Sequence, residues 1–166
     1  MVSDVEEITE KTISKGGILA KLYFDMQGEK GEELQPLMAD LINNRLLKSP
    51  GVVYCFGSIE EPIMIEGYFS TSAAITTLFK DLGAAINVVF NFAPIGIEVL
   101  KPSGEYSVKT SNLQSILIDL SNISTNYSTY IMNNVLSPDE KTRLEEEVKR
   151  RKALGNHMLD KHGKES

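Results

Sequence analysis

The stretch ILAKLYFD, from Ile18 to Asp25, alternates apolar residues with more polar ones. Ile18 is followed at every second position by another apolar residue, while Lys21 and Asp25 fall between them. Successive side chains of a strand point to opposite faces, so this pattern predicts a half-buried β-strand. Such a strand supplies one apolar face, and the rest of the fold depends on what covers that face.

The residues after this strand predict five more elements up to Leu100. Apolar residues at helical spacing over residues 33–48 predict a helix. VVYCFGSI, residues 52–59, is apolar on both faces and predicts a central strand. We expect EEPI, residues 60–63, to form a turn, and MIEGYFS, residues 64–70, to return as the second strand of a hairpin.

The next two elements are expected to be a helix and a strand. SAAITTLFKDL, residues 72–82, predicts a helix capped by one of the hydroxyl residues at 70–72 and ended by Gly83. INVVFNFAPIGIEVL, residues 86–100, predicts one long strand, or two short strands broken at Pro94 and Gly96.

The expected order is therefore strand, helix, strand, strand, helix, strand. Two right-handed crossovers of this kind interleave in one antiparallel sheet, with both helices on one face. Residues 18–100 thus resemble the ferredoxin-like α+β sandwich. The predicted class is α+β, with a βαββαβ antiparallel sheet, a short N-terminal helix before Gly16 and a two-helix C-terminal extension.

Four stretches are similar to an uncharacterised family of archaeal cytosolic proteins. These stretches are YCFGSIEEPI (54–63), GYFSTSAAI (67–75), FAPIGIEVLKP (92–102) and IDLSNISTNYSTYI (118–131). The resemblance implies a cytoplasmic protein and brings no known activity with it.

The composition changes near KPSGEYS, residues 101–107. Residues 1–101 hold 14 acidic and 8 basic residues, whereas residues 102–166 hold 9 of each. We therefore expect a core over residues 1–101 and a helical extension over residues 102–166, which packs on the core or on a second subunit. A second C-terminal helix should begin at the capping box formed by Ser137 and Glu140.

The first C-terminal helix is expected over SNLQSILIDLSNISTNYSTYIMNN, residues 111–134. Half of these residues are Ser, Asn or Thr, which are mediocre helix formers, and the only charged residue is Asp119. Apolar residues nevertheless recur at spacings of 3, 4, 3, 4 and 3, the pattern of a coiled-coil interface. The predicted interface residues are Leu113, Ile116, Leu120, Ile123, Tyr127 and Tyr130. Because propensity does not favour this helix, we expect it to be buried on more than one side.

The overall composition argues against several classes of function. The formal net charge is -6, which argues against nucleic acid and against anionic lipid as partners. No apolar run is long enough to span a membrane, and the acidic N-terminus does not resemble a signal peptide. The single cysteine, Cys55, excludes an internal disulfide. We expect a cytoplasmic location.

Few residues are candidates for catalysis or for binding a metal ion. The carboxylates of Asp25, Glu60 and Glu61 are the candidate catalytic groups, because paired carboxylates can serve acid–base reactions. His157 and His162 are five residues apart, about 140° around a helix, so they predict no metal site. We expect no cofactor.

Three hypotheses follow. The first is a non-enzymatic structural or interaction module, expected to be a homodimer. The second is a regulatory domain of the ACT or Lrp type that senses an unidentified small molecule at the loop Asp25–Gly31. The third is an enzyme whose carboxylate-based site lies at a subunit interface.

Overall fold

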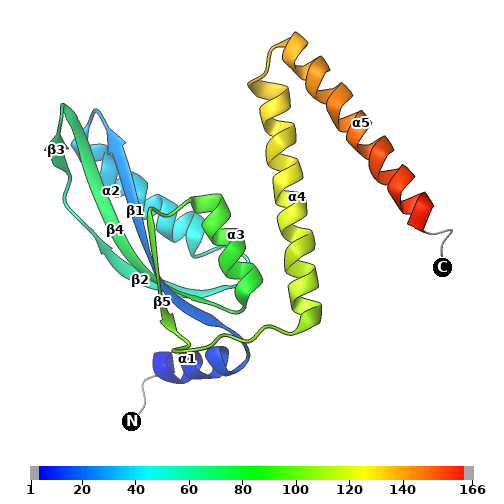
Figure 1. Ribbon diagram of the computed structural model, residues 1–166. Helices are drawn as coiled ribbons and strands as arrows, with labels where there is room; N and C mark the ends of the chain where they lie inside the picture. The colour runs from blue at the N-terminus through cyan, green and yellow to red at the C-terminus, as the bar shows by residue number, and fades with distance from the viewer. Residues whose placement is uncertain (1–3, 163–166) are drawn as a thin grey trace. The chain divides into compact units, whose positions relative to one another are not determined.

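A computed structural model describes residues 4–162 of the chain (Figure 1). It divides into a sheet unit, which extends through Leu113, and a helical unit, which begins at Gln114. The elements are α1 (Asp4–Ser14), β1 (Ile18–Gly28), α2 (Gly31–Asp40), a π-helical turn η1 (Leu41–Leu46), β2 (Val52–Ile59), β3 (Ile63–Ile65), β4 (Tyr68–Phe79), α3 (Leu82–Phe92), β5 (Gly96–Lys101), α4 (Thr110–Asn134) and α5 (Pro138–His162).

The sheet is antiparallel and has five strands. Four of them follow the order β2-β4-β1-β5, and the short β3 pairs with the start of β4. The central pair is β1 and β4, which run in register from Ile18 opposite Phe79 to Gly28 opposite Phe69. The predicted α+β class and antiparallel sheet are confirmed.

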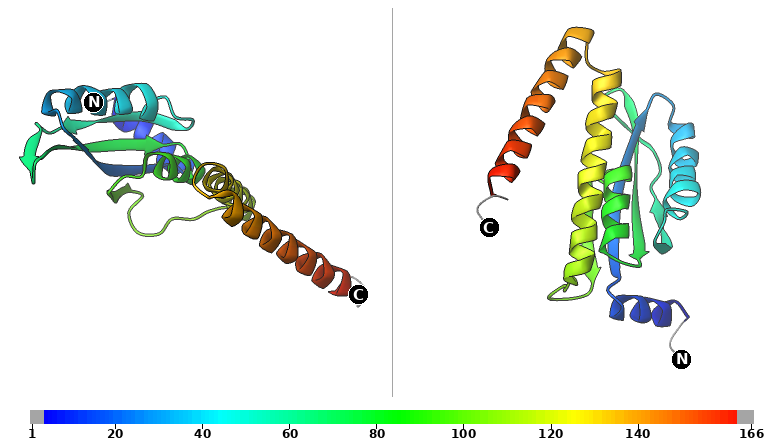
Figure 2. Two further views of the ribbon diagram at one scale, coloured as in Figure 1. Left: turned by 90° about the horizontal axis from the view of Figure 1, so that it is seen from above. Right: turned by 90° about the vertical axis from the view of Figure 1, so that its right-hand side faces the viewer.

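The alternation that begins at Ile18 determines which face of the sheet is buried. Ile18, Ala20, Leu22 and Phe24 are all buried, so the predicted half-buried strand is confirmed. They form one apolar core with side chains of β4 and of the helices that flank the sheet; Figure 2 shows α2 running alongside the strands. The helical members of this core are Met38, Ile42, Leu46, Ala84 and Val88.

The predicted helix over residues 72–82 is wrong, because these residues continue β4 as far as Phe79. Thr71, Ala73, Ile75 and Thr77 are buried in alternation, which is the period of a strand. The β-branched side chains fit a pleated sheet better than a helix, and this preference outweighs the helical tendency of the two alanines at 73 and 74.

The second helix instead lies at residues 82–92, where the sequence had predicted a strand. Asp81 provides its N-cap, since its carboxylate oxygen accepts a 2.8 Å hydrogen bond from the backbone N–H of Ala84. Ala84 and Val88 are four residues apart and both buried, as one face of a helix requires. The helix ends at Ala93, which has a φ of 44°, just before Pro94, and only β5 remains of the predicted strand.

The predicted turn at residues 60–63 also needs correction. The two-residue hairpin turn is formed by Glu66 and Gly67, whose φ angles are 50° and 90°. Two positive φ values at the centre are typical of the type I′ turn that suits twisted hairpins. Glu66 is therefore a turn residue and not part of the returning strand. Glu60 lies in the connection between β2 and β3.

Both predicted C-terminal helices are present as α4 and α5. The capping box at the start of α5 is confirmed, because a Glu140 carboxylate oxygen accepts hydrogen bonds from the Ser137 backbone N–H at 3.0 Å and from its hydroxyl at 2.6 Å. These hydrogen bonds lower the pKa of Glu140. Within residues 4–162, no helix combines the length and the hydropathy needed to cross a membrane.

Candidate interaction surfaces

The six predicted interface residues of α4, which we call the α4 seam, do lie on one helix. Leu113, Leu120 and Tyr130 are 45%, 39% and 62% exposed, whereas Ile116 is 8% exposed. Ile123 is half-buried, and Tyr127 is exposed. The α4 seam is therefore an apolar stripe that α4 itself leaves unpaired, and its role as an interface stays a prediction.

The small polar residues of α4 make hydrogen bonds within the helix itself. The Thr125 and Thr129 hydroxyls each donate a 2.9 Å hydrogen bond to the carbonyl oxygen four residues earlier, and the Asn134 amide donates to the Tyr130 carbonyl oxygen at 3.0 Å. These hydrogen bonds satisfy the polar side chains without a partner from outside the helix, and the expected burial of α4 on two sides stays a prediction.

The three candidate catalytic carboxylates lie near the far end of the sheet from α1. Asp25 lies on β1 opposite Ser72 of β4, and the Glu60 backbone N–H donates a 2.8 Å hydrogen bond to the Ser72 carbonyl oxygen. Ser72 thus has Asp25 of β1 on one side and Glu60, the residue after β2, on the other. Glu61 follows Glu60 in the connection to β3, and all three carboxylates are exposed.

No group of three His, Cys, Asp or Glu residues suited to a metal ion is present among the described residues. His157 is exposed, and the side chain of His162 lies outside the described part of the chain. Cys55 is half-buried in β2, and burial raises the pKa of its thiol, which disfavours the reactive thiolate. These side chains do not form a recognisable catalytic constellation.

A pocket of about 420 Å³ lies beside the loop that the sequence had suggested for a small ligand. Lys30 and Gly31 contribute to it from that loop and the start of α2, and the other residues that line it are Glu32, Gln35, Pro62 and Phe69. The Gln35 side chain, at the wall of the pocket, donates a 3.1 Å hydrogen bond to the Glu60 carbonyl oxygen. This bond joins α2 to the connection between β2 and β3.

A second apolar surface was missed by the sequence reasoning. Ile63, Met64 and Ile65 of β3 are 61%, 65% and 50% exposed, and Tyr68 across the turn is 56% exposed. We call these four residues the apolar hairpin. The signal was available in the sequence, because three consecutive apolar residues stand between Glu61 and Glu66. From the sequence, Ile63 was assigned to a turn and Met64 and Ile65 to a strand, so their joint exposure was not predicted.

These features define the chain as an α+β protein with an antiparallel sheet, an apolar stripe on α4, an exposed apolar hairpin and no recognisable catalytic centre among its described residues. The chain belongs to the MJ0538 family, whose family model matches residues 19–149. The family description names no activity. No curated protein and no solved structure gave a match to the chain.

Proposed function

We propose that this protein is a cytoplasmic, non-enzymatic interaction module that forms a homodimer through the α4 seam. The observation that carries the proposal is the heptad spacing of the α4 seam combined with the near absence of charged residues from α4. A regular apolar stripe of this kind inserts its side chains between those of a facing helix. A second copy of the same helix provides a matching stripe under two-fold symmetry.

The charge of α4 supports pairing with a copy of itself. Asp119 is the only charged residue from Thr110 to Asn134, so two such helices approach each other without like-charge repulsion. In contrast, α5 carries many acidic and basic residues and only a narrow apolar stripe, which suits a helix that faces water. Small Ser, Asn and Thr side chains on α4 also allow the close approach of a second helix.

The sheet unit would provide the rigid body of this module, and we propose that it is a ferredoxin-like sandwich. Its strand order, β2-β4-β1-β5, supports this assignment, since a crossover helix follows β1 and another follows β4. Helices that cover one face leave edges and loops available for contacts, as in other modules of this architecture.

The dimer can be tested by sedimentation of the full chain at micromolar concentration. Leu120→Glu places a charge in the middle of the α4 seam and should convert a dimer into a monomer. Thr125→Glu is the matched control, because Thr125 lies on the opposite side of α4 and is exposed. A wild-type chain that sediments as a monomer would contradict the proposal.

Sensing of a small ligand is a second candidate function, favoured by the pocket beside Lys30 and Gly31. A pocket of this size fits an amino acid or a similar metabolite. A thermal-shift screen with free amino acids and nucleotides tests this candidate, because a ligand that binds only the folded chain raises Tm. No shift with any of them would argue against the ACT-type or Lrp-type role.

A further inference from the structure

The strand β3 is an edge strand that lies at the end of the sheet opposite α1 (Figure 1). Among the described residues it pairs with β4 alone. Its three side chains point alternately to the two faces of the hairpin, and yet all three are at least half exposed. Both faces and one edge of β3 are therefore accessible, which is the situation that natural proteins usually avoid for an apolar strand.

The register of the hairpin determines which backbone groups β3 offers. Ile65 and Tyr68 flank the two-residue turn, and Met64 lies opposite Phe69. In a type I′ hairpin the residues that flank the turn hydrogen-bond to each other, and the next pair does not. Met64 therefore directs its backbone N–H and C=O away from β4, where a further strand can bind to both.

The residues around this edge are predominantly acidic. The carboxylates of Glu29, Glu32, Glu60, Glu61 and Glu66, which we call the acidic rim, are all exposed. They come from the β1–α2 connection, from the first turn of α2, from the β2–β3 connection and from the hairpin turn. The only basic residue in these segments, Lys30, forms a salt bridge with Glu33, in which its Nζ lies 2.9 Å from the Glu33 Oε1.

We propose that the β3 edge binds an extended segment of a partner protein in which apolar residues alternate with Lys or Arg. The segment adds to the sheet as a further strand: its backbone pairs with Met64, its apolar side chains cover the apolar hairpin, and its cations meet the acidic rim. A second copy of this chain does not suit the edge, because pairing β3 with β3 would bring two acidic rims together.

The pocket of about 420 Å³ extends this surface. Pro62, in its wall, directly precedes β3, and Phe69, also in its wall, pairs with Met64. One long side chain of the added strand enters here, with its methylene groups against Pro62 and Phe69 and its cationic end near Glu32. This surface shares no residue with the α4 seam, so the inference does not depend on the proposed dimer.

The test uses the full chain and a capped synthetic peptide of about eight residues, the length of a strand, in which Val alternates with Lys. Backbone-amide NMR should show the largest shifts at Ile63, Met64 and Ile65, and raising the salt concentration should weaken binding. The Glu60→Gln/Glu61→Gln double variant should bind about tenfold more weakly. As a matched control, Glu145→Gln/Glu146→Gln on α5 makes the same change in net charge and should leave the affinity unaltered.

Two altered peptides separate strand addition from simple charge attraction. Methylation of alternate backbone nitrogens removes the N–H groups that pair with an edge strand, so this peptide should not bind. Replacing every Lys by Glu should also abolish binding. Absence of binding by the Val–Lys peptide, equal binding of its N-methylated form, or shifts centred on β5 or α4 would overturn the proposal. Concentration-dependent shifts at Met64 without peptide would show that the occupant is a second copy and would also overturn it.

Discussion

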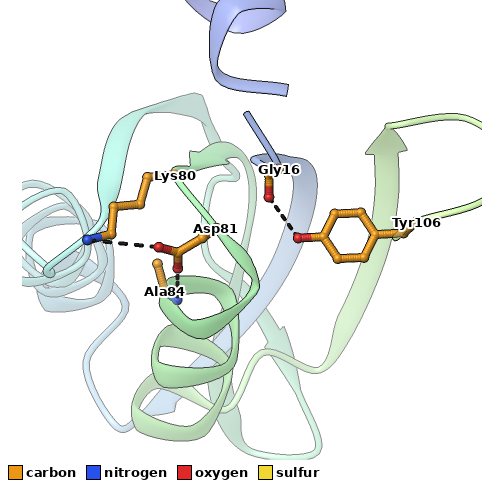
Figure 3. A network of polar contacts seen from close by, with 5 residues as sticks. All are labelled: Gly16, Lys80, Asp81, Ala84 and Tyr106. Atoms are coloured by element: carbon orange, nitrogen blue, oxygen red, sulfur yellow. Dashed lines mark hydrogen bonds and ion pairs between the residues drawn. The ribbon is translucent and has the colours of Figure 1, made fainter. Parts of the chain in front are cut away.

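The phenol hydroxyl of Tyr106 donates a 2.7 Å hydrogen bond to the backbone carbonyl oxygen of Gly16, 90 positions earlier in the chain (Figure 3). Gly16 lies in the turn between α1 and β1, and Tyr106 lies after β5. The ring of Tyr106 also packs against the apolar core. This hydrogen bond therefore holds the segment that follows β5 against the turn that precedes β1.

Tyr106→Phe should destabilise the sheet unit by about 1 kcal/mol, because the Gly16 carbonyl loses a partly buried hydrogen bond while the ring is retained. Thermal unfolding followed by circular dichroism checks this value. The same variant at Tyr68, an exposed tyrosine of the apolar hairpin, serves as the control and should leave Tm nearly unchanged.

The contribution of Tyr106 should also depend on pH. Burial, and secondly the negative charge of Asp81, raise the pKa of the Tyr106 hydroxyl above its ordinary value of 10.0. A group whose pKa is higher in the folded state stabilises the fold fully below its unfolded pKa and loses this effect as the pH rises through the folded pKa. The stability difference between wild type and Tyr106→Phe should therefore be constant at neutral pH and shrink above about pH 10. A difference that grows with alkaline pH would contradict this assignment.

At Thr77, in contrast to Tyr106, a substitution should increase the stability of the fold. The Thr77 side chain is 0% exposed near the C-terminal end of β4, and within the described chain its hydroxyl oxygen has no hydrogen-bond partner. Thr77→Val replaces this hydroxyl by a methyl group of similar shape, so the free energy of unfolding should rise by about 1 kcal/mol. Urea unfolding measures the change. A clear loss of stability would indicate that the hydroxyl is satisfied in solution, for instance by a bound water molecule.

Gly57 occupies a position on β2 where a side chain does not fit. A Cβ atom there would collide with the Ala74 carbonyl group of the neighbouring strand. Gly57→Ala should therefore destabilise the sheet unit by about 2 kcal/mol or more, since backbone on both strands has to shift. Ser58→Ala, at the exposed next position, is the control and should change stability by less than about 0.5 kcal/mol. Equal effects of the two substitutions would contradict the packing described for β2 and β4.

The capping box of α5 predicts a further response to pH. The pKa of Glu140 is lowered by hydrogen bonds from the Ser137 side chain and backbone, so this carboxylate supports the start of the helix above its unfolded pKa. The support should be lost as the pH falls through the lower, folded pKa. Amide NMR signals of Asp139 and Lys141 report this fraying, and Ser137→Ala should show it already at neutral pH. An unchanged first turn at low pH would show that the cap does not stabilise α5.

The sequence predicted well those elements whose pattern had only one interpretation. The strict alternation from Ile18 identified β1, and Ser137 with Glu140 identified the start of α5. The predictions failed between Ser72 and Phe92, where apolar residues have neither a clean period of two nor one of 3.6. There the cap decided the outcome: Asp81 starts α3, whereas we had assigned the start of a helix to a hydroxyl residue at 70–72.

The candidate surfaces were predicted only in part. The α4 seam could be predicted because its heptad spacing is visible in the sequence. The neighbour that covers this seam could not be predicted, since nothing in α4 itself identifies it. The apolar hairpin depends on the position of the turn at Glu66 and Gly67, which places β3 at the edge of the sheet with both faces open. The sequence analysis had placed the turn at residues 60–63, and with the turn there this exposed surface could not be recognised.

The most direct test of this account is sedimentation equilibrium of the full wild-type chain, beside Leu120→Glu and Thr125→Glu, over a range of micromolar concentrations. We predict a dimer for wild type and for Thr125→Glu and a folded monomer for Leu120→Glu, with circular dichroism to confirm that α4 stays helical. A wild-type monomer at every concentration, or a dimer that persists in Leu120→Glu, would contradict the claim that the α4 seam joins two copies of this protein.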